Sequence, residues 1–93
     1  MGLKVVWSKR AEKNYTHILD YIVSRFGEAS GIKYFERVQN LISLLRQHPE
    51  LGTRQVADRG IHAIVLFRRT TIFYVFNESE LRIINVVDNR WNK

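Results

Sequence analysis

Apolar residues recur at helical spacing in the first third of the chain. Ser8 is suited to cap the amino end of a helix that begins at Lys9, and Gly27 is suited to end it. Between them, one stripe is formed by Ala11, Tyr15, Ile18, Leu19, Ile22 and Phe26. The pattern predicts an amphipathic helix that ends at Gly27, preceded by a short strand over Lys4 to Trp7.

A second helix is predicted from about Ser30 to His48, where Pro49 and Gly52 stop it. Its apolar positions are Ile32, Tyr34, Phe35, Val38, Leu41, Ile42, Leu44 and Leu45. This set is wider than one contact surface requires. The width fits a helix that lies between the first helix and a sheet, and the short connection makes the two a helical hairpin.

After a polar stretch from Gly52 to Gly60, the pattern changes from helical to extended. Strands are predicted over Ile61 to Phe67, Thr71 to Phe76 and Leu81 to Val87, separated by short polar breaks of the length of hairpin loops. The three strands form an antiparallel meander. The predicted fold is therefore α+β: an N-terminal strand, a two-helix antiparallel hairpin, and a three-stranded meander that completes one sheet.

The predicted strands do not alternate between apolar and polar residues. Residues 64–67 are all apolar, and so are residues 72–76. Both faces of the sheet are then apolar, and the helices can cover only one of them. The second face indicates an external partner or self-association, unless the strands are central strands with good local packing.

Composition limits the class of protein. A chain of 93 residues fits one domain, which we assign to residues 1–93, and the 45% apolar content allows it a core. The chain has no cysteine, which favours a reducing compartment, and no apolar run approaches the roughly 20 residues that span a bilayer. We expect a cytoplasmic protein.

The net charge of +6 favours a polyanion or an acidic protein as partner. The three histidines lack metal-binding spacing, and no phosphate-binding glycine loop or serine-hydrolase motif occurs. We expect no metal and no cofactor.

The remaining candidate site is cationic and comes from the meander and its flanks. Its members are Arg54, Arg59, Arg68, Arg69, Arg82 and Arg90, with His62 among them and Trp91 beside the last. Metal-free RNA cleavage requires a base, an acid and cations that stabilise charge at phosphorus, and histidine titrates near neutrality. The alternative is that the arginines are solvated surface residues that pair with nearby acids, with His62 a surface histidine and Trp91 a lid on the core.

The order and spacing of these segments resemble the RelE/ParE superfamily of toxins. The resemblance is carried by Trp7-Ser8, Ala11 and Tyr21-Ile22, by the run LLRQHPELG, and by the segment from Arg59 to Arg90, so it spans nearly the whole chain. It implies the toxin of a type II toxin–antitoxin system, held inactive by a cognate antitoxin that would cover the second face of the sheet. The long helical hairpin resembles the ParE-like branch in particular.

The resemblance leaves two targets open. ParE-like members inhibit DNA gyrase, whereas RelE-like members are ribosome-dependent mRNA endonucleases with basic residues on the sheet and a C-terminal catalytic tyrosine or histidine. Here Asp88 stands where many members carry histidine. We expect a non-enzymatic gyrase inhibitor. The alternatives are an inactive module that only binds antitoxin and a ribonuclease that uses His62, Arg59, Arg68, Arg82 and Arg90. We expect a hetero-oligomer with the antitoxin, and a homodimer is an open alternative for the free chain.

Overall fold

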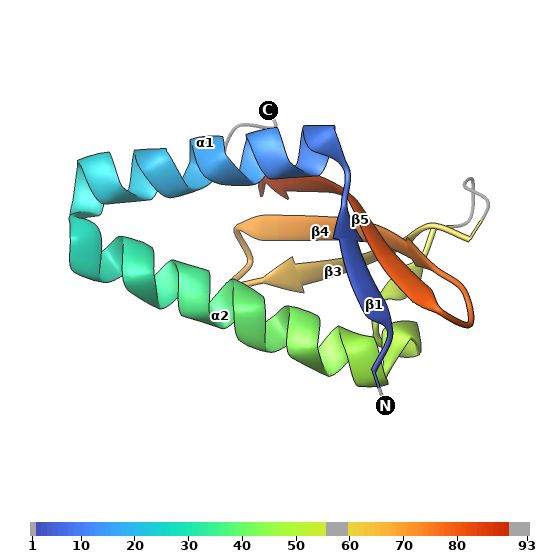
Figure 1. Ribbon diagram of the computed structural model, residues 1–93. Helices are drawn as coiled ribbons and strands as arrows, with labels where there is room; N and C mark the ends of the chain where they lie inside the picture. The colour runs from blue at the N-terminus through green and yellow to red at the C-terminus, as the bar shows by residue number, and fades with distance from the viewer. Residues whose placement is uncertain (1, 56–59, 90–93) are drawn as a thin grey trace.

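The computed structural model describes residues 2–55 and 60–89, in which a helical hairpin packs on a mixed sheet (Figure 1). The elements in chain order are β1 (Lys4–Trp7), α1 (Lys9–Phe26), α2 (Glu28–Gln47), the 3-10 helix η1 (Pro49–Leu51), β2 (Thr53–Arg54), β3 (His62–Leu66), β4 (Thr70–Phe76) and β5 (Glu80–Asp88). The α+β order predicted from the sequence is confirmed. The two-residue strand β2 was not predicted, because its polar sequence gives no strand signal.

The helical hairpin begins and turns at the residues that the sequence indicated. The Ser8 Oγ accepts a hydrogen bond from the Ala11 amide at 3.0 Å, which caps α1. Gly27 adopts a φ of 95°, a conformation that costs glycine little. This one residue connects the helices, so α2 begins at Glu28, two residues earlier than predicted.

The sheet has the strand order β1-β5-β4-β3-β2. The N-terminal strand β1 pairs in parallel with β5, and the other neighbouring pairs are antiparallel. The register between β4 and β5 shifts next to Tyr74. At the end of β1, the Ser8 Oγ also donates a hydrogen bond to the Ile84 carbonyl at 3.0 Å, so the helix cap is fastened to β5.

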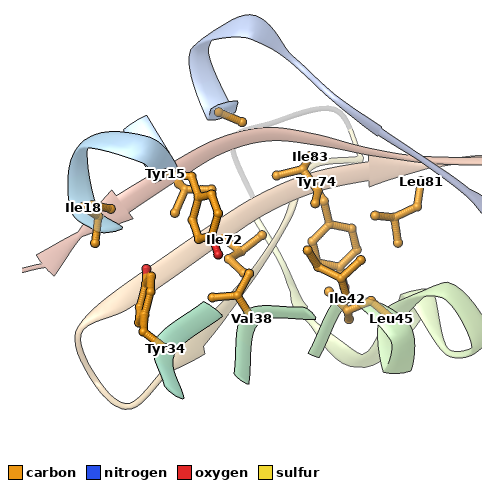
Figure 2. Packing of buried hydrophobic residues seen from close by; sticks show 12 residues of the cluster. Tyr15, Ile18, Tyr34, Val38, Ile42, Leu45, Ile72, Tyr74, Leu81 and Ile83 are labelled. Carbon is orange, nitrogen blue, oxygen red and sulfur yellow. The ribbon is translucent and has the colours of Figure 1, made fainter. Parts of the chain in front are cut away.

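The core lies between the hairpin and one face of the sheet (Figure 2). Its fully buried side chains include Ile18 from α1, Val38 and Leu45 from α2, and Ile72, Tyr74, Leu81, Ile83 and Val86 from the sheet. The Tyr74 hydroxyl also anchors the segment after α2, because it donates to the Pro49 carbonyl at 2.6 Å and accepts from the Gly52 amide at 2.8 Å. A Cβ on residue 52 would lie 2.5 Å from this hydroxyl, so glycine is needed there.

The second face of the sheet carries the predicted apolar residues, together with Thr71 and Arg82, and does not belong to the core. Strand pairing places Val65 and Val87 on either side of Thr71, and Phe73 and Val75 extend the same face along β4. We call Val65, Phe73, Val75 and Val87 the open sheet face; none of them packs in the core cluster. Val65 is 54% exposed, so a partner has apolar surface to cover here.

Neither α1 nor α2 is long and apolar enough to cross a membrane; this finding concerns the described residues alone.

Candidate functional site

His62 lies at the start of β3 in an aromatic environment. Its ring centre is 5.6 Å from that of Tyr74 and 5.1 Å from that of Phe76. Its Nδ1 is 3.1 Å from the Gly60 carbonyl oxygen. Arg54 is directly opposite His62 in the pairing of β2 with β3, so the structure brings these two residues of the predicted cationic site together.

Arg82 lies on the other face of the sheet. It pairs with Val75 of β4, whereas His62 pairs with Tyr74, and consecutive residues of a strand point to opposite faces. The Arg82 Nη2 forms an ion pair with the Glu80 Oε2 at 3.0 Å. The sheet itself therefore separates Arg82 from His62.

Arg68 and Arg69 lie in the turn that joins β3 to β4, at the opposite end of β3 from His62. A strand of this length separates its ends by about 13 Å. The described members of the predicted cationic site thus fall in three places. Arg59, Arg90 and Trp91 lie outside the described residues, so their part in a site stays a prediction.

The turn between β3 and β4 has an unusual backbone. Phe67 and Arg68 have φ values of 58° and 62°, and the Arg69 amide donates to the Leu66 carbonyl at 3.1 Å. Two central residues of positive φ define a type I′ turn, in which asparagine and glycine are the favoured residues. Phenylalanine and arginine are disfavoured in this conformation, so the turn is strained.

Two residues distant in sequence hold this strained turn. Asn89, just beyond β5, donates from its Nδ2 to the Arg68 carbonyl at 3.4 Å, and its backbone amide donates to the Arg69 carbonyl. The Thr71 hydroxyl in turn donates to the Asn89 Oδ1 at 2.9 Å. From α2, the guanidinium carbon of Arg37 lies 4.7 Å from the centre of the Phe67 ring, a cation–π contact.

A cleft of about 310 Å³ separates the turn from the hairpin. Ile18, Ile22, Phe26, Ser30, Tyr34, Phe67, Arg69, Thr70 and Asp88 line it. Figure 1 shows the β3–β4 connection pointing toward the closed end of the hairpin, where this cleft lies. Its lining is mostly apolar, with a few polar groups among the hydrocarbon side chains, as is typical of binding clefts.

The polar part of the cleft is largely buried. The hydroxyls of Tyr34 and Thr70 lie 3.0 Å apart, and Asp88 is only 2% exposed. Burial raises the pKa of Tyr34, and the nearby Asp88 raises it further, while the hydrogen bond with Thr70 opposes the shift. A carboxyl group with so little exposure has poor access to a large substrate.

A second cleft, of about 470 Å³, lies on the hairpin between α1 and α2. Leu19, Val23, Glu28, Gly31, Ile32 and Phe35 line it. Ile32 is 60% exposed, and Val23 and Phe35 are also exposed. The hairpin therefore presents apolar surface in addition to the open sheet face.

The sequence did not indicate Arg37, Phe67 or Asn89 as site residues. The turn lacks the Asn-Gly or Gly-Gly signal of a type I′ turn, so Phe67 was assigned to the preceding strand. Arg37 has the ordinary pattern of an exposed helical arginine. Its contact with Phe67 joins residues from different elements, and no spacing rule within one element reveals it.

The fold and the site define a small basic α+β protein, with a helical hairpin on a mixed sheet and a cationic aromatic turn at one end. Residues 5–90 match the sequence model of the family described as the ParE toxin of the type II toxin–antitoxin system, parDE. The chain belongs to this family: it is a type II toxin of the ParE/RelE superfamily.

Solved structures share the fold. A chain of the chromosomal ParDE toxin–antitoxin system from P. aeruginosa is 17% identical with a TM-score of 0.77, covering 92% of this chain and 95% of that one. A chain of the E. coli DinJ-YafQ toxin–antitoxin complex is 12% identical with a TM-score of 0.65, covering 98% and 97%. The conserved hypothetical protein HP0894 from Helicobacter pylori is 13% identical with a TM-score of 0.56, covering 95% and 96%. A search of curated proteins found no match.

Proposed function

We propose that this toxin inhibits growth by binding DNA gyrase, that it needs no catalysis by its own side chains, and that a cognate antitoxin neutralises it. The observation that carries the proposal is the separation of His62 from Arg68 and Arg82, two of the cations that the ribonuclease alternative requires. Arg82 is on the opposite face of the sheet, and Arg68 is at the far end of β3. Membership of the ParE toxin family supports the same target.

The alternative, RNA cleavage, has strict geometric requirements. A general base or acid acts within hydrogen-bond reach of the proton it moves, and the cations must contact the same phosphate. His62 instead stacks on Tyr74 and contacts the tilted ring of Phe76, with its Nδ1 near the Gly60 carbonyl oxygen. Asp88, at the position where the superfamily often has histidine, is buried.

The proposed antitoxin covers apolar surface that the toxin leaves exposed. The open sheet face and the cleft that contains Ile32 and Phe35 are the two such surfaces described above. The net charge of +6 favours an acidic antitoxin. Two similar structures come from toxin–antitoxin systems, which supports a partner of this kind. The proposed location is the cytoplasm.

Expression of the toxin in cells tests the target. We expect loss of plasmid supercoiling and induction of the DNA-damage response, while primer extension on ribosome-bound messages shows no new ends. New message ends with normal supercoiling would instead support a ribonuclease. Undiminished growth at high expression would support an inactive antitoxin-binding module.

A further inference from the structure

The turn at Phe67 and Arg68 is held in a conformation that its residues disfavour. Both have positive φ without being glycine or asparagine. Such backbone strain persists only where surrounding contacts determine it, and it concentrates at functional sites. Here those contacts are the hydrogen bonds of Asn89 and the stacking of Arg37. The backbone of the turn is thus held by Asn89, and the Phe67 ring is in contact with Arg37.

The exposed groups of this turn are one aromatic ring and several cations. Phe67 is 46% exposed, and Arg37, Arg68 and Arg69 are exposed. Lys33 lies about one helical turn before Arg37, on a neighbouring part of the α2 surface. Among the described residues, Arg82 forms an ion pair with Glu80. This pair lies far from the cations of the turn.

We propose that Arg37, Phe67 and Arg68 form a nucleic-acid contact. Guanidinium groups bind phosphate oxygens through paired donors, and an exposed aromatic ring stacks on an unstacked base. Arg37 lies over the ring and Arg68 follows Phe67 in the turn, so a stacking surface and cations lie together, as the bases and phosphates of a single strand require. The cleft beside Phe67 leaves space for a base next to the ring.

This inference rests on the proposed function in one respect, since gyrase holds DNA and the contact would then be with that DNA. The shared chemistry, phosphate with an accessible base, also occurs in RNA. An acidic peptide is the competing partner. The exposed Phe67 ring beside the Arg37 guanidinium favours a nucleic acid, because a base stacks on an aromatic ring without regard to sequence while the phosphates pair with the cations.

Fluorescence anisotropy of the purified full-length toxin with labelled oligonucleotides tests the contact. Single-stranded DNA, RNA of the same sequence and duplex DNA are titrated at several salt concentrations. We expect salt-dependent binding, with affinity reduced at least tenfold by Arg37→Ala or Arg68→Ala, and a salt slope lower by about 1 for each variant. Arg10→Ala, which removes the same charge from the start of α1, is the matched control and keeps most of the affinity.

The double variant Phe67→Asn, Arg68→Gly separates function from folding. These residues suit a type I′ turn, so the melting temperature should rise by several degrees while nucleic-acid affinity falls at least tenfold. A more stable variant with unchanged affinity would overturn the proposal. Loss of antitoxin binding without loss of nucleic-acid binding would also overturn it, in favour of a protein partner.

The comparison of single-stranded DNA, RNA and duplex DNA tests this proposal separately from the gyrase proposal. Preference for single-stranded DNA supports both. Preference for RNA supports the contact at Phe67 but contradicts gyrase as the target. Equal loss of affinity in Arg10→Ala and Arg68→Ala would show that only net charge matters and would overturn the assigned site.

Discussion

His62 and Arg82 lie on opposite faces of the sheet, although their strands both pair with β4. His62 is opposite Tyr74, which is fully buried in the core, and Arg82 is opposite the neighbouring Val75. Alternation along β4 then places the imidazole and the guanidinium on different sides. A proton-transfer group and a phosphate-binding cation in this arrangement do not share one scissile phosphate.

The variant His62→Phe is expected to retain full growth inhibition. Phenylalanine preserves the ring contacts with Tyr74 and Phe76 but lacks the imidazole nitrogens that could transfer a proton. The comparison is made at equal expression, with the melting temperature measured alongside. A variant that is as stable as the wild type yet no longer arrests growth would show that the imidazole takes part in the chemistry.

The Tyr74 hydroxyl should contribute substantially to stability. Tyr74→Phe removes the acceptor of the Gly52 amide and the donor to the Pro49 carbonyl, so we expect a loss of about 1–3 kcal/mol in urea unfolding. Tyr15→Phe is the matched control, because the buried Tyr15 hydroxyl has no hydrogen-bond partner of good geometry among the described residues. It should be neutral or slightly stabilising. Equal losses in both variants would contradict this account of the anchor.

Stability should fall as the pH rises from about 10 to about 12. Burial, together with the electrostatic effect of Tyr34, raises the pKa of Tyr15 to about 12. The nearby Gln39 side chain acts in the opposite direction and lowers this pKa. Burial also raises the pKa of Tyr34 and of Tyr74. The unfolded chain releases these protons at lower pH than the folded protein does. The stability that is present below pH 10 is therefore lost as the pH approaches the tyrosine pKa of the folded state. Melting temperatures of the wild type and Tyr15→Phe between pH 9 and 12 should diverge, with the smaller decrease in the variant.

The open sheet face should bind the antitoxin. Val65→Asp places a charge on an exposed apolar position, so it should weaken antitoxin binding at least tenfold while the melting temperature changes little. Leu44→Asp introduces the same charge at an exposed position of α2 and should bind normally. Calorimetric titration with the purified antitoxin measures both. Unchanged affinity in Val65→Asp would exclude this face as part of the interface.

Local signals account for the parts of the fold that the sequence predicted. Ser8 caps α1 with its own side chain, and Gly27 ends it through its own backbone conformation. Both ends of α1 could therefore be predicted from the sequence. The turn after β3 was misplaced by one residue because Phe67 resembles a strand residue, and its positive φ depends on Asn89 and Arg37. Strand β2 forms through pairing with β3 and has no local pattern of its own.

The site was harder to predict than the fold. The arginines of the meander and its flanks were predicted to form one group, whereas strand alternation and strand length separate Arg54, Arg68 and Arg82. Which face a side chain occupies depends on strand register, and the register becomes certain only when the pairing is known. The contact of Arg37 with Phe67 joins α2 to the turn after β3, and no spacing rule within one element predicts it.

Inhibition of purified gyrase tests the central claim most directly. Relaxed plasmid is incubated with gyrase, ATP and increasing toxin, and supercoiling is followed by gel electrophoresis. We predict that the wild type and His62→Phe inhibit supercoiling at the same toxin concentration and that added antitoxin restores it. Full supercoiling at a large excess of folded toxin, with cleavage of ribosome-bound mRNA by the same preparation, would contradict the account.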